Sequence, residues 1–424
     1  MKFLSWLTLL SSTIAWLGAY SLAHAADEDA LDLQVQATPT PTTGEQSPIR
    51  LSVEAGFGRL HLGDGLSTQA TQRFSIDFRY ATVVSKEWRL AFSSRLDAVH
   101  PAAIQRASTL NSVREASVGW QREGGLTTFD LGRINQRHAP AYGFSPTDYF
   151  KYRALRAVTT ADPAALRENR MGTAMLRVGQ QWGRGEVSLA LVPKLANTSS
   201  DGSFALDLGA TNSTDKMLMA ANTKHSDSLS TQVSWLAERG SGSKIGASVN
   251  ALASSAAVVY GELSFGSMRS LAGLAGVAAD DRRRNSQAAF GITYTLMSNL
   301  SVTVESEYSG TGLNRDELQK VLAQAPAISQ RFLALNLSSQ ELVSRRAWLV
   351  YAVQKGLVIK QLDLSMLVRQ NAVDHSSFAW IELRHHWGQL DTALQWQRGL
   401  GGSLTEYGSL PYRQAFQILG AWYF

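Results

Sequence analysis

The chain has 424 residues, a hydrophobic fraction of 44% and a formal net charge of +5, which suits a folded protein of about one to three domains. No stretch beyond the N-terminus approaches the roughly 20 apolar residues of a membrane-spanning helix, so a helical membrane protein is excluded. Cysteine is absent, which excludes disulfides, thiolate metal sites, cysteine nucleophiles and a lipoprotein anchor.

The 40 basic residues are mostly arginine. Arginine makes planar, multidentate contacts to carboxylates, phosphates and sulfates, and it forms ion pairs across barrels. The basic excess is mild, and it comes without a lysine-rich patch or a nucleic-acid motif. We therefore expect no nucleic-acid partner.

The N-terminus carries a secretory signal. Lys2 precedes the apolar run FLSWLTLLSSTIAWLGAY, and Ala23 and Ala25 form an A-x-A-type cleavage site. Residues 1–25 are therefore expected to be a signal peptide that is cleaved after Ala25. The Thr/Pro-rich residues 26–49 have little to bury, which predicts a flexible periplasmic segment without chemistry. Residues 50–424 are expected to form the single folded domain.

From residue 50 onward the apolar residues recur with a period of two, which indicates strands. Residues 72–80 and 88–97 show the pattern clearly, and 300–309 and 389–397 repeat it. One face suits lipid, while arginine, aspartate and glutamate on the other suit a wet interior. In the first of these stretches the two faces hold Phe74, Ile76, Phe78 and Tyr80 against Arg73, Ser75, Asp77 and Arg79.

The spacing of these patterns predicts about 18 strands of about 9–12 residues, the length that crosses a bilayer when tilted. Short connections alternate with mostly long ones, as in outer-membrane barrels, whereas a β-sandwich has no reason to sort its loops in this way. The fold class is therefore all-β, a transmembrane antiparallel β-barrel with long extracellular loops and short periplasmic turns; about 16 strands is the alternative count. The expected strands are residues 50–61, 71–81, 87–98, 112–121, 126–134, 170–180, 185–194, 216–224, 229–238, 244–252, 256–266, 286–296, 300–308, 344–354, 357–369, 376–386, 389–398 and 413–424.

Aromatic residues and the last strand support this class. The aromatic residues recur near the expected strand ends, as in the girdles of membrane barrels: Trp88, Trp120, Tyr260, Trp348, Trp380, Trp396 and Trp422. The last strand carries Phe416, Ile418, Trp422 and Phe424 in alternation, with Gly420 as a departure. This strand resembles the C-terminal sorting signal of Gram-negative outer-membrane porin-like β-barrel proteins. The resemblance implies location in the outer membrane, recognition by the barrel-assembly machinery, and contact with outer-membrane lipid and lipopolysaccharide.

Residues 135–169 form the most unusual connection, because it is long, net basic and rich in tyrosine. Pro140, Gly143 and Pro146 can bend it into the barrel, where it would narrow the lumen as the constriction loop of general porins does. The alternative is an ordered surface loop held by Arg–Asp pairs. Its SPTDYF element also resembles, more weakly, alginate-export-type barrels. The candidate residues for this constriction loop are Arg133, Arg137, Tyr149, Phe150, Arg153 and Arg156.

Charged residues at inward strand positions are a second signal. A basic row on adjacent strands is expected to face an acidic wall across the barrel, and such a field orients dipolar solutes. The basic row, or arginine row, consists of Arg73, Arg79, Arg89 and Arg95, and the acidic wall consists of Glu305, Glu307 and Asp363. Alternatively the charges pair within the wall, Asp77 with Arg79 or Arg89 and Asp97 with Arg95; both arrangements can hold together. The lumen candidates are Arg73, Arg79, Arg89, Arg95, Arg346, Arg369, Glu305 and Glu307.

Other loop features are weaker. Asn314 with Glu317 three residues later forms a capping box, which predicts a short helix over the mouth of the barrel. The cluster Arg282–Arg284 could meet lipopolysaccharide phosphates or simply be solvated. Ser376 beside His375, and His385 beside His386, lack a G-x-S-x-G or H-E-x-x-H context, so we expect no enzyme, no cofactor and no metal site.

The sequence therefore predicts a barrel in the outer membrane of a Gram-negative bacterium that serves as a porin-like channel. The expected solutes are small, hydrophilic, and anionic or sugar-like. A dedicated exporter or secretion partner for an anionic polysaccharide is one alternative, and a structural barrel with a plugged lumen is another. The strand count leaves open whether the barrel is a monomer or a homo-oligomer.

Overall fold

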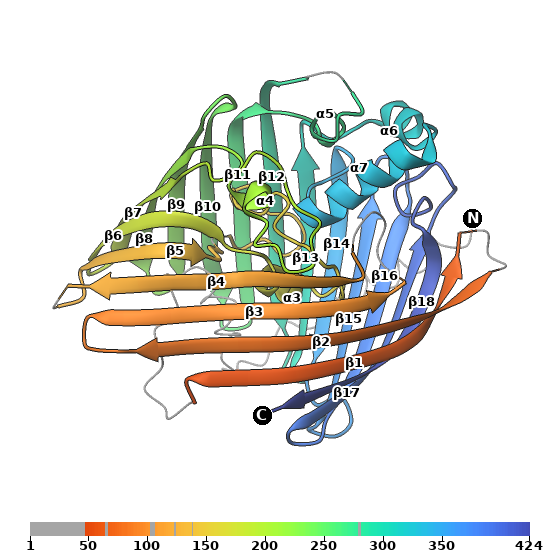
Figure 1. The fold of residues 1–424 in the computed structure, drawn as a ribbon, viewed down its shortest axis with the longest axis horizontal. Helices are drawn as coiled ribbons and strands as arrows, with labels where there is room; N and C mark the ends of the chain where they lie inside the picture. Colours follow the sequence, from red (N-terminus) through yellow and green to blue (C-terminus); the bar gives the residue numbers. More distant parts are fainter. Residues whose placement is uncertain (1–46, 64–66, 102–106, 123, 138, 279–280) are drawn as a thin grey trace.

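The computed structural model describes residues 47–63, 67–101, 107–122, 124–137, 139–278 and 281–424. Within these residues, 18 strands form one antiparallel sheet in which each strand pairs with the next, and β18 pairs back onto β1 to close a barrel (Figure 1). The predicted fold class and the count of 18 strands are confirmed. The expected signal peptide and nearly all of the expected segment 26–49 lie outside the described residues.

Each predicted strand is present, and most ends differ from the prediction by a few residues. The first nine are β1 (Ile49–Leu62), β2 (Thr68–Val83), β3 (Trp88–His100), β4 (Thr109–Gln121), β5 (Thr127–Ile134), β6 (Thr173–Trp182), β7 (Gly185–Val192), β8 (Lys216–Ser226) and β9 (Leu229–Glu238). The others are β10 (Gly242–Ser254), β11 (Ala257–Met268), β12 (Arg283–Thr295), β13 (Leu300–Ser309), β14 (Arg346–Gln354), β15 (Leu362–Asn371), β16 (Ser377–His386), β17 (Leu390–Leu400) and β18 (Tyr412–Tyr423).

The barrel closes through its first and last strands. Phe57 lies opposite Ile418, and the backbone N–H of Phe424 donates to the carbonyl of Leu51 at 3.0 Å. This pairing completes the closed barrel that the sequence predicted. The four sorting-signal candidates at the C-terminus are all exposed: Phe416, Ile418, Trp422 and Phe424. Their role in sorting stays a prediction.

Alternation places apolar side chains outside the barrel and polar ones inside, as predicted. On β2, Phe74 is exposed, whereas Arg73 and Asp77 are buried. On β13, Val304 is exposed and Glu305 is buried. Because successive side chains of a strand point to opposite faces, one residue of known direction fixes the direction of the others as far as no bulge interrupts the strand.

This alternation of inward and outward side chains corrects three predictions. Arg346 shares the exposed face of β14 with Trp348, so it is not a lumen residue. Tyr260 and Trp380 are buried on inward positions and do not belong to an aromatic girdle. The interior accepts such rings because other aromatic side chains pack there, as Tyr142 does with Tyr260 at 6.2 Å between ring centroids.

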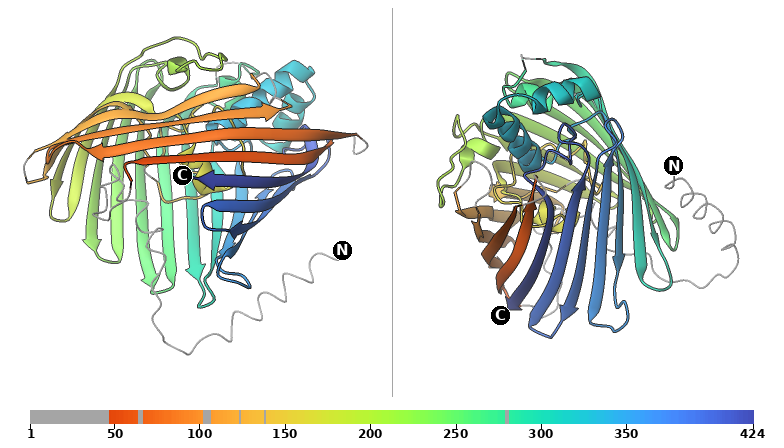
Figure 2. Two further views of the ribbon diagram at one scale, coloured as in Figure 1. Left: turned by 60° about the horizontal axis from the view of Figure 1, so that its bottom comes forward. Right: turned by 90° about the vertical axis from the view of Figure 1, so that its right-hand side faces the viewer.

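Short turns gather at one end of the barrel and mostly longer segments at the other, as predicted. Figure 2 shows α6 and α7 at the end opposite the C-terminus. The predicted start of β15 at residue 357 is wrong, because Gly356 has a positive φ of 65° and the N–H of Leu357 closes a turn onto the carbonyl of Leu362 at 2.7 Å. The apolar run Leu357–Ile359 extended the strand pattern into this turn.

Helices occupy parts of the longer segments. The predicted capping box is confirmed at the start of α6, where the side chain of Asn314 accepts from the N–H of Glu317 at 2.9 Å. The longest helix was not predicted, because it begins at Pro326 without a side-chain cap. No helix in the part of the chain that the structure describes is long and apolar enough to cross a membrane. The helices are α3 (Pro163–Glu168), α4 (Leu208–Thr211), α5 (Leu271–Leu274), α6 (Arg315–Leu322) and α7 (Pro326–Ser339).

Candidate functional site

The described residues of the segment between β5 and β6, 135–137 and 139–172, lie inside the barrel (Figure 2). Glu305 of β13 holds its first part, because its carboxylate accepts from the backbone N–H groups of Tyr142 at 2.7 Å and of Gly143 and Phe144 at 3.0 Å. The hydroxyl of Tyr260 donates to the same carboxylate at 2.7 Å. A carboxylate offers about four acceptor positions, so these contacts use the hydrogen-bonding capacity of Glu305.

Glu262 of β11 holds the residues on both sides of this part in the same way. Its carboxylate accepts from the N–H of Ala141 at 2.8 Å and from the hydroxyl of Ser145 at 2.9 Å. Thr147 donates to it through both its N–H and its hydroxyl, at 3.1 Å and 2.8 Å. Backbone N–H groups need partners when they leave water, and these inward carboxylates provide them.

The segment also packs on the wall of the barrel through apolar side chains. Phe150 lies in a buried cluster with Met175, Leu218 and Leu236, which come from β6, β8 and β9. Tyr149 packs against this cluster, and its hydroxyl lies 3.3 Å from that of Ser264 on β11. The segment is therefore fixed to the wall between β6 and β13.

Arginines at the end of β5 and in the segment bind backbone carbonyls or a hydroxyl group rather than standing free in the lumen. Arg133 donates to the carbonyl of Leu206 at 2.6 Å, and Arg153 donates to the hydroxyl of Ser199 at 2.6 Å. Both partners belong to the connection 193–215, which these contacts tie down. Arg156 reinforces this by donating to the carbonyls of Asn111 (2.5 Å), Ser200 (3.2 Å), Gly202 (2.8 Å) and Ala205 (3.0 Å).

Arg137 has a different environment. It is half-buried, and burial lowers the pKa of its guanidinium while the carboxylates of Glu168 and Glu115 act in the opposite direction. The six constriction-loop candidates therefore do not gather around one opening. They divide into loop anchors (Arg133, Arg153, Arg156), wall contacts (Tyr149, Phe150) and Arg137 near acidic neighbours.

The predicted basic row is present on β2 and β3, and its arginines are paired within the barrel. Asp77 with Arg79 and Asp97 with Arg95 are the pairs that the sequence suggested. Arg89 pairs instead with Asp130 of β5. The distances are 2.7 Å for Arg73–Glu54, 3.2 Å for Arg79–Asp77, 3.4 Å for Arg89–Asp130, 2.9 Å for Arg95–Asp97 and 3.4 Å for Arg95–Glu54.

Asp77 is the centre of this network, and the sequence did not reveal its main partner. Arg114 of β4, only 2% exposed, donates to both carboxylate oxygens of Asp77, one of them at 2.7 Å. Its inward direction was hidden because the register of β3 and β4 shifts between Ser93 and Ser94. Such a bulge changes which residues face inward, so strict alternation could not place Arg114.

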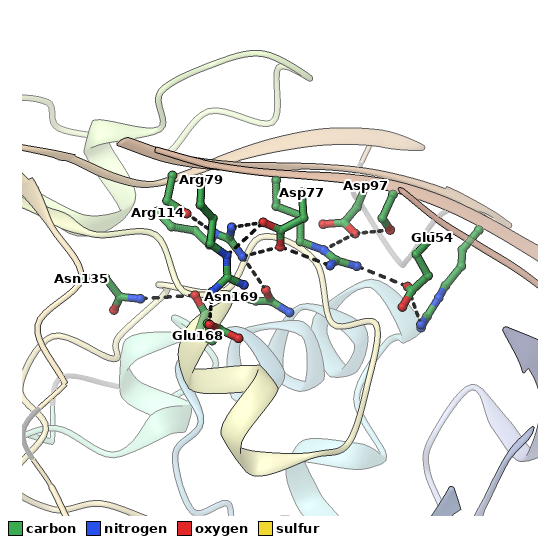
Figure 3. Close-up of polar contacts among 12 residues, drawn as sticks. Glu54, Asp77, Arg79, Asp97, Arg114, Asn135, Glu168 and Asn169 are labelled. Atoms are coloured by element: carbon green, nitrogen blue, oxygen red, sulfur yellow. Dashed lines mark hydrogen bonds and ion pairs between the residues drawn. The ribbon is translucent and has the colours of Figure 1, made fainter. Parts of the chain in front are cut away.

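The network joins the wall to the infolded segment (Figure 3). Arg79 donates to the carboxylate of Glu168 at the end of α3, and Arg114 donates to the side-chain oxygen of Asn169 at 3.1 Å. Burial opposes ionisation of Glu168, but the hydrogen bond and charge of Arg79 outweigh it and hold the pKa of this carboxyl below its usual range. The segment is thus held from both sides of the barrel.

The predicted acidic wall is not open to the lumen. Glu305 is 0% exposed and bound to the infolded segment, and Glu307 is buried and paired with Arg369 of β15 at 2.6 Å. The lumen candidates Glu305, Glu307 and Arg369 are inward as predicted, but they hold the interior together.

Ser376 and His386, from the two histidine-containing pairs, are both hydrogen-bonded to neighbouring residues. The hydroxyl of Ser376 donates to Asp374 at 2.6 Å and accepts from the N–H of Tyr407 at 3.3 Å. His386 lies inside the barrel between Asp391, at 2.7 Å, and Asp363, at 3.3 Å. These contacts give the hydroxyl and the imidazole structural partners.

Solved structures share this architecture. OccK8 (OprE) of Pseudomonas aeruginosa matches with a TM-score of 0.55 and 10% sequence identity over 90% of this chain and 98% of that chain. OccAB1 of Acinetobacter baumannii matches with a TM-score of 0.54 and 11% identity over 91% and 98%. The outer membrane protein opdK from Pseudomonas aeruginosa matches with a TM-score of 0.51 and 8% identity over 89% and 98%.

These matches define the class of fold: the chain is a closed β-barrel of the kind seen in outer-membrane barrel structures such as opdK. The predicted likeness to porin-like outer-membrane barrels is confirmed at the level of the fold. The sequence matches no protein-family model and no curated protein.

Proposed function

We propose that this protein is a channel in the outer membrane of a Gram-negative bacterium for small hydrophilic solutes, preferably anionic or sugar-like ones. The observation that carries the proposal is a closed 18-stranded barrel with an apolar exterior and a charged interior. Barrels of this size enclose a space that admits water unless a segment fills it. The infolded segment packs on the β6–β13 side and reaches across to Arg79 and Arg114, so the proposed path runs beside this segment and past the arginine row.

The proposal includes the environment of the barrel. Secretion with cleavage after Ala25, assembly by the barrel-assembly machinery through the last strand, and a lipid-facing exterior form one consistent route. The exposed Arg283 and Arg284 at the start of β12 suit the phosphates of lipopolysaccharide.

Glu54→Gln tests the selectivity of this channel. Glu54 pairs with both Arg73 and Arg95, so its neutralisation leaves two inward guanidinium groups less compensated. Planar-bilayer recordings in a KCl gradient are expected to show discrete conductance with anion preference, and the chloride-to-potassium permeability ratio of the variant is expected to rise roughly twofold or more.

The matched control is Glu87→Gln, which removes the same charge from the turn between β2 and β3, outside the barrel interior. It is expected to leave the ratio unchanged. A barrel that inserts without discrete conductance contradicts the channel and supports the plugged barrel. Cation preference that persists when Arg73, Arg89 and Arg95 are replaced contradicts the anionic class of solutes.

A further inference from the structure

A cavity of about 520 Å³ lies inside the barrel beside the infolded segment. Its volume falls within the roughly 300–1,000 Å³ of pockets that hold drug-sized ligands. Residues 155–166 and helix α7 line one part of it, and the inner faces of β1, β2, β17 and β18 line another. These two parts differ in chemistry.

The part formed by the infolded segment and α7 is apolar. Val158 and Leu337 line the cavity and are 45% and 46% exposed, so water reaches large apolar side chains inside the barrel. Helix α7 is fixed from its other side, because Phe332 is buried in a cluster with Leu318 of α6 and Leu271 of α5. An apolar group that displaces water from Val158 and Leu337 would gain free energy of binding.

The part formed by β1, β2, β17 and β18 carries several neutral polar side chains. Gln397 of β17 and Gln417 of β18 line it from inward positions, and the amide of Gln397 donates to the hydroxyl of Tyr412 at 3.0 Å. Gln69 and Thr71 of β2 extend the same surface. Amide side chains both donate and accept hydrogen bonds, which matches the hydroxyl groups of a ligand.

Charges in the lining are compensated by protein partners. Three pairs have short or moderate distances: Arg73–Glu54 at 2.7 Å, Arg369–Glu307 at 2.6 Å and Lys151–Glu341 at 3.3 Å. Arg156 is held by backbone carbonyls and by Asp207. Burial raises the pKa of Glu406 to about 7, so this lining carboxyl is partly neutral near neutral pH.

We propose that this cavity binds an uncharged amphiphile with an apolar ring and a hydroxyl-bearing part. The ring lies against Val158 and Leu337, and the hydroxyl groups face the side chains of Gln397 and Gln417. Aryl glycosides have this chemistry. This proposal names one chemical class among the sugar-like solutes of the proposed channel. It rests on the proposed function only in that the ligand has to enter the barrel interior.

The first test is isothermal titration calorimetry of the full chain in phosphatidylcholine nanodiscs, which avoids detergents that are themselves glycosides. The probe is 4-nitrophenyl β-D-glucopyranoside, compared with D-glucose and with 4-nitrophenyl β-D-glucuronide. The glucoside is expected to bind at least about tenfold more tightly than either. If glucose binds as tightly as the glucoside, the proposed contact of the aryl ring with the apolar part of the cavity is wrong. If the glucuronide binds more tightly, the proposal that the ligand is uncharged is wrong.

The second test locates the ligand. Leu337→Asn is expected to weaken binding of the glucoside at least about fivefold, because it removes apolar contact area. The control is Ile328→Asn on the same helix, 38% exposed and outside the lining, which is expected to leave the affinity unchanged. If Leu337→Asn binds as tightly as the unaltered chain, the ligand lies elsewhere and the proposal is wrong.

Bilayer recordings on the same preparations separate this proposal from the channel. A barrel that binds the glucoside but carries no current contradicts the channel and leaves the cavity site in place. A conducting barrel that does not bind the glucoside contradicts the cavity site and leaves the channel in place.

Discussion

Replacing Glu262 and Glu305 together by alanine is expected to raise the single-channel conductance several-fold in planar bilayers. The two carboxylates accept the backbone N–H groups of residues 141–144 and 147. Without them, buried donors lose their acceptors, at about 1–3 kcal/mol for each unsatisfied group. The stretch is then expected to move out of the barrel interior, which widens the path through the barrel.

The release is expected to be partial. The cluster around Phe150 keeps the following stretch on β6, β8 and β9, and Arg79 keeps Glu168 near β2. The movable part is therefore the stretch from 141 to 147, which the two glutamates hold. Adding Phe150→Ala to the double variant is expected to increase the conductance further.

Glu186→Ala is the control for this double variant. Glu186 is also an inward carboxylate, but it pairs with Arg177 of β6 at 2.7 Å and not with the infolded segment. Folding of each variant is checked by the mobility of unheated and heated protein in gel electrophoresis. If the double variant folds and its conductance equals that of the unaltered chain, the glutamates do not set the width of the path.

The fold was predictable because its rules are local. Each strand needs only a period of two over about ten residues, and the sorting of connections by length then selects a membrane barrel. Exceptions arose where a local pattern continued past a structural break. The apolar run Leu357–Ile359 resembled a strand although it lies in a turn before β15.

The site was predictable only in part, because whether a side chain faces inward or outward depends on the register of its strand. Arg73, Arg79, Arg89 and Arg95 were placed inside because their strands alternate without interruption. Arg114 was missed because a bulge interrupts β4. Arg346 was misplaced because one residue of register separates the lumen from the lipid face.

Partners distant in the chain could not be predicted at all. Glu262 binds the backbone N–H groups of Ala141 and Thr147, and a backbone N–H carries no signal in the amino-acid sequence. Only the fold brings β11 and the infolded segment together. The same holds for Arg156, whose partners are carbonyl groups.

Asp77→Ala is expected to be the most destabilising single change in the arginine row. Asp77 accepts from Arg79 and Arg114 and lies 3.6 Å from Arg95. Removing it leaves Arg114 buried without its counter-charge, and breaking a buried pair from one side costs about 3–5 kcal/mol. The free energy of unfolding in urea, measured for the barrel in lipid vesicles, is expected to fall by about this amount.

The loss is expected to be recovered when the buried charge is removed as well. In Asp77→Ala/Arg114→Met no isolated guanidinium remains, so the double variant is expected to be more stable than Asp77→Ala alone. The exposed pair Asp215–Arg239 is the control, since breaking a solvated pair changes stability little. If Arg114→Met does not restore stability, the cost of losing Asp77 lies in its contacts with Arg79 and Arg95. The hydrogen bond to Asn169 of the infolded segment is then sufficient to stabilise the guanidinium of Arg114.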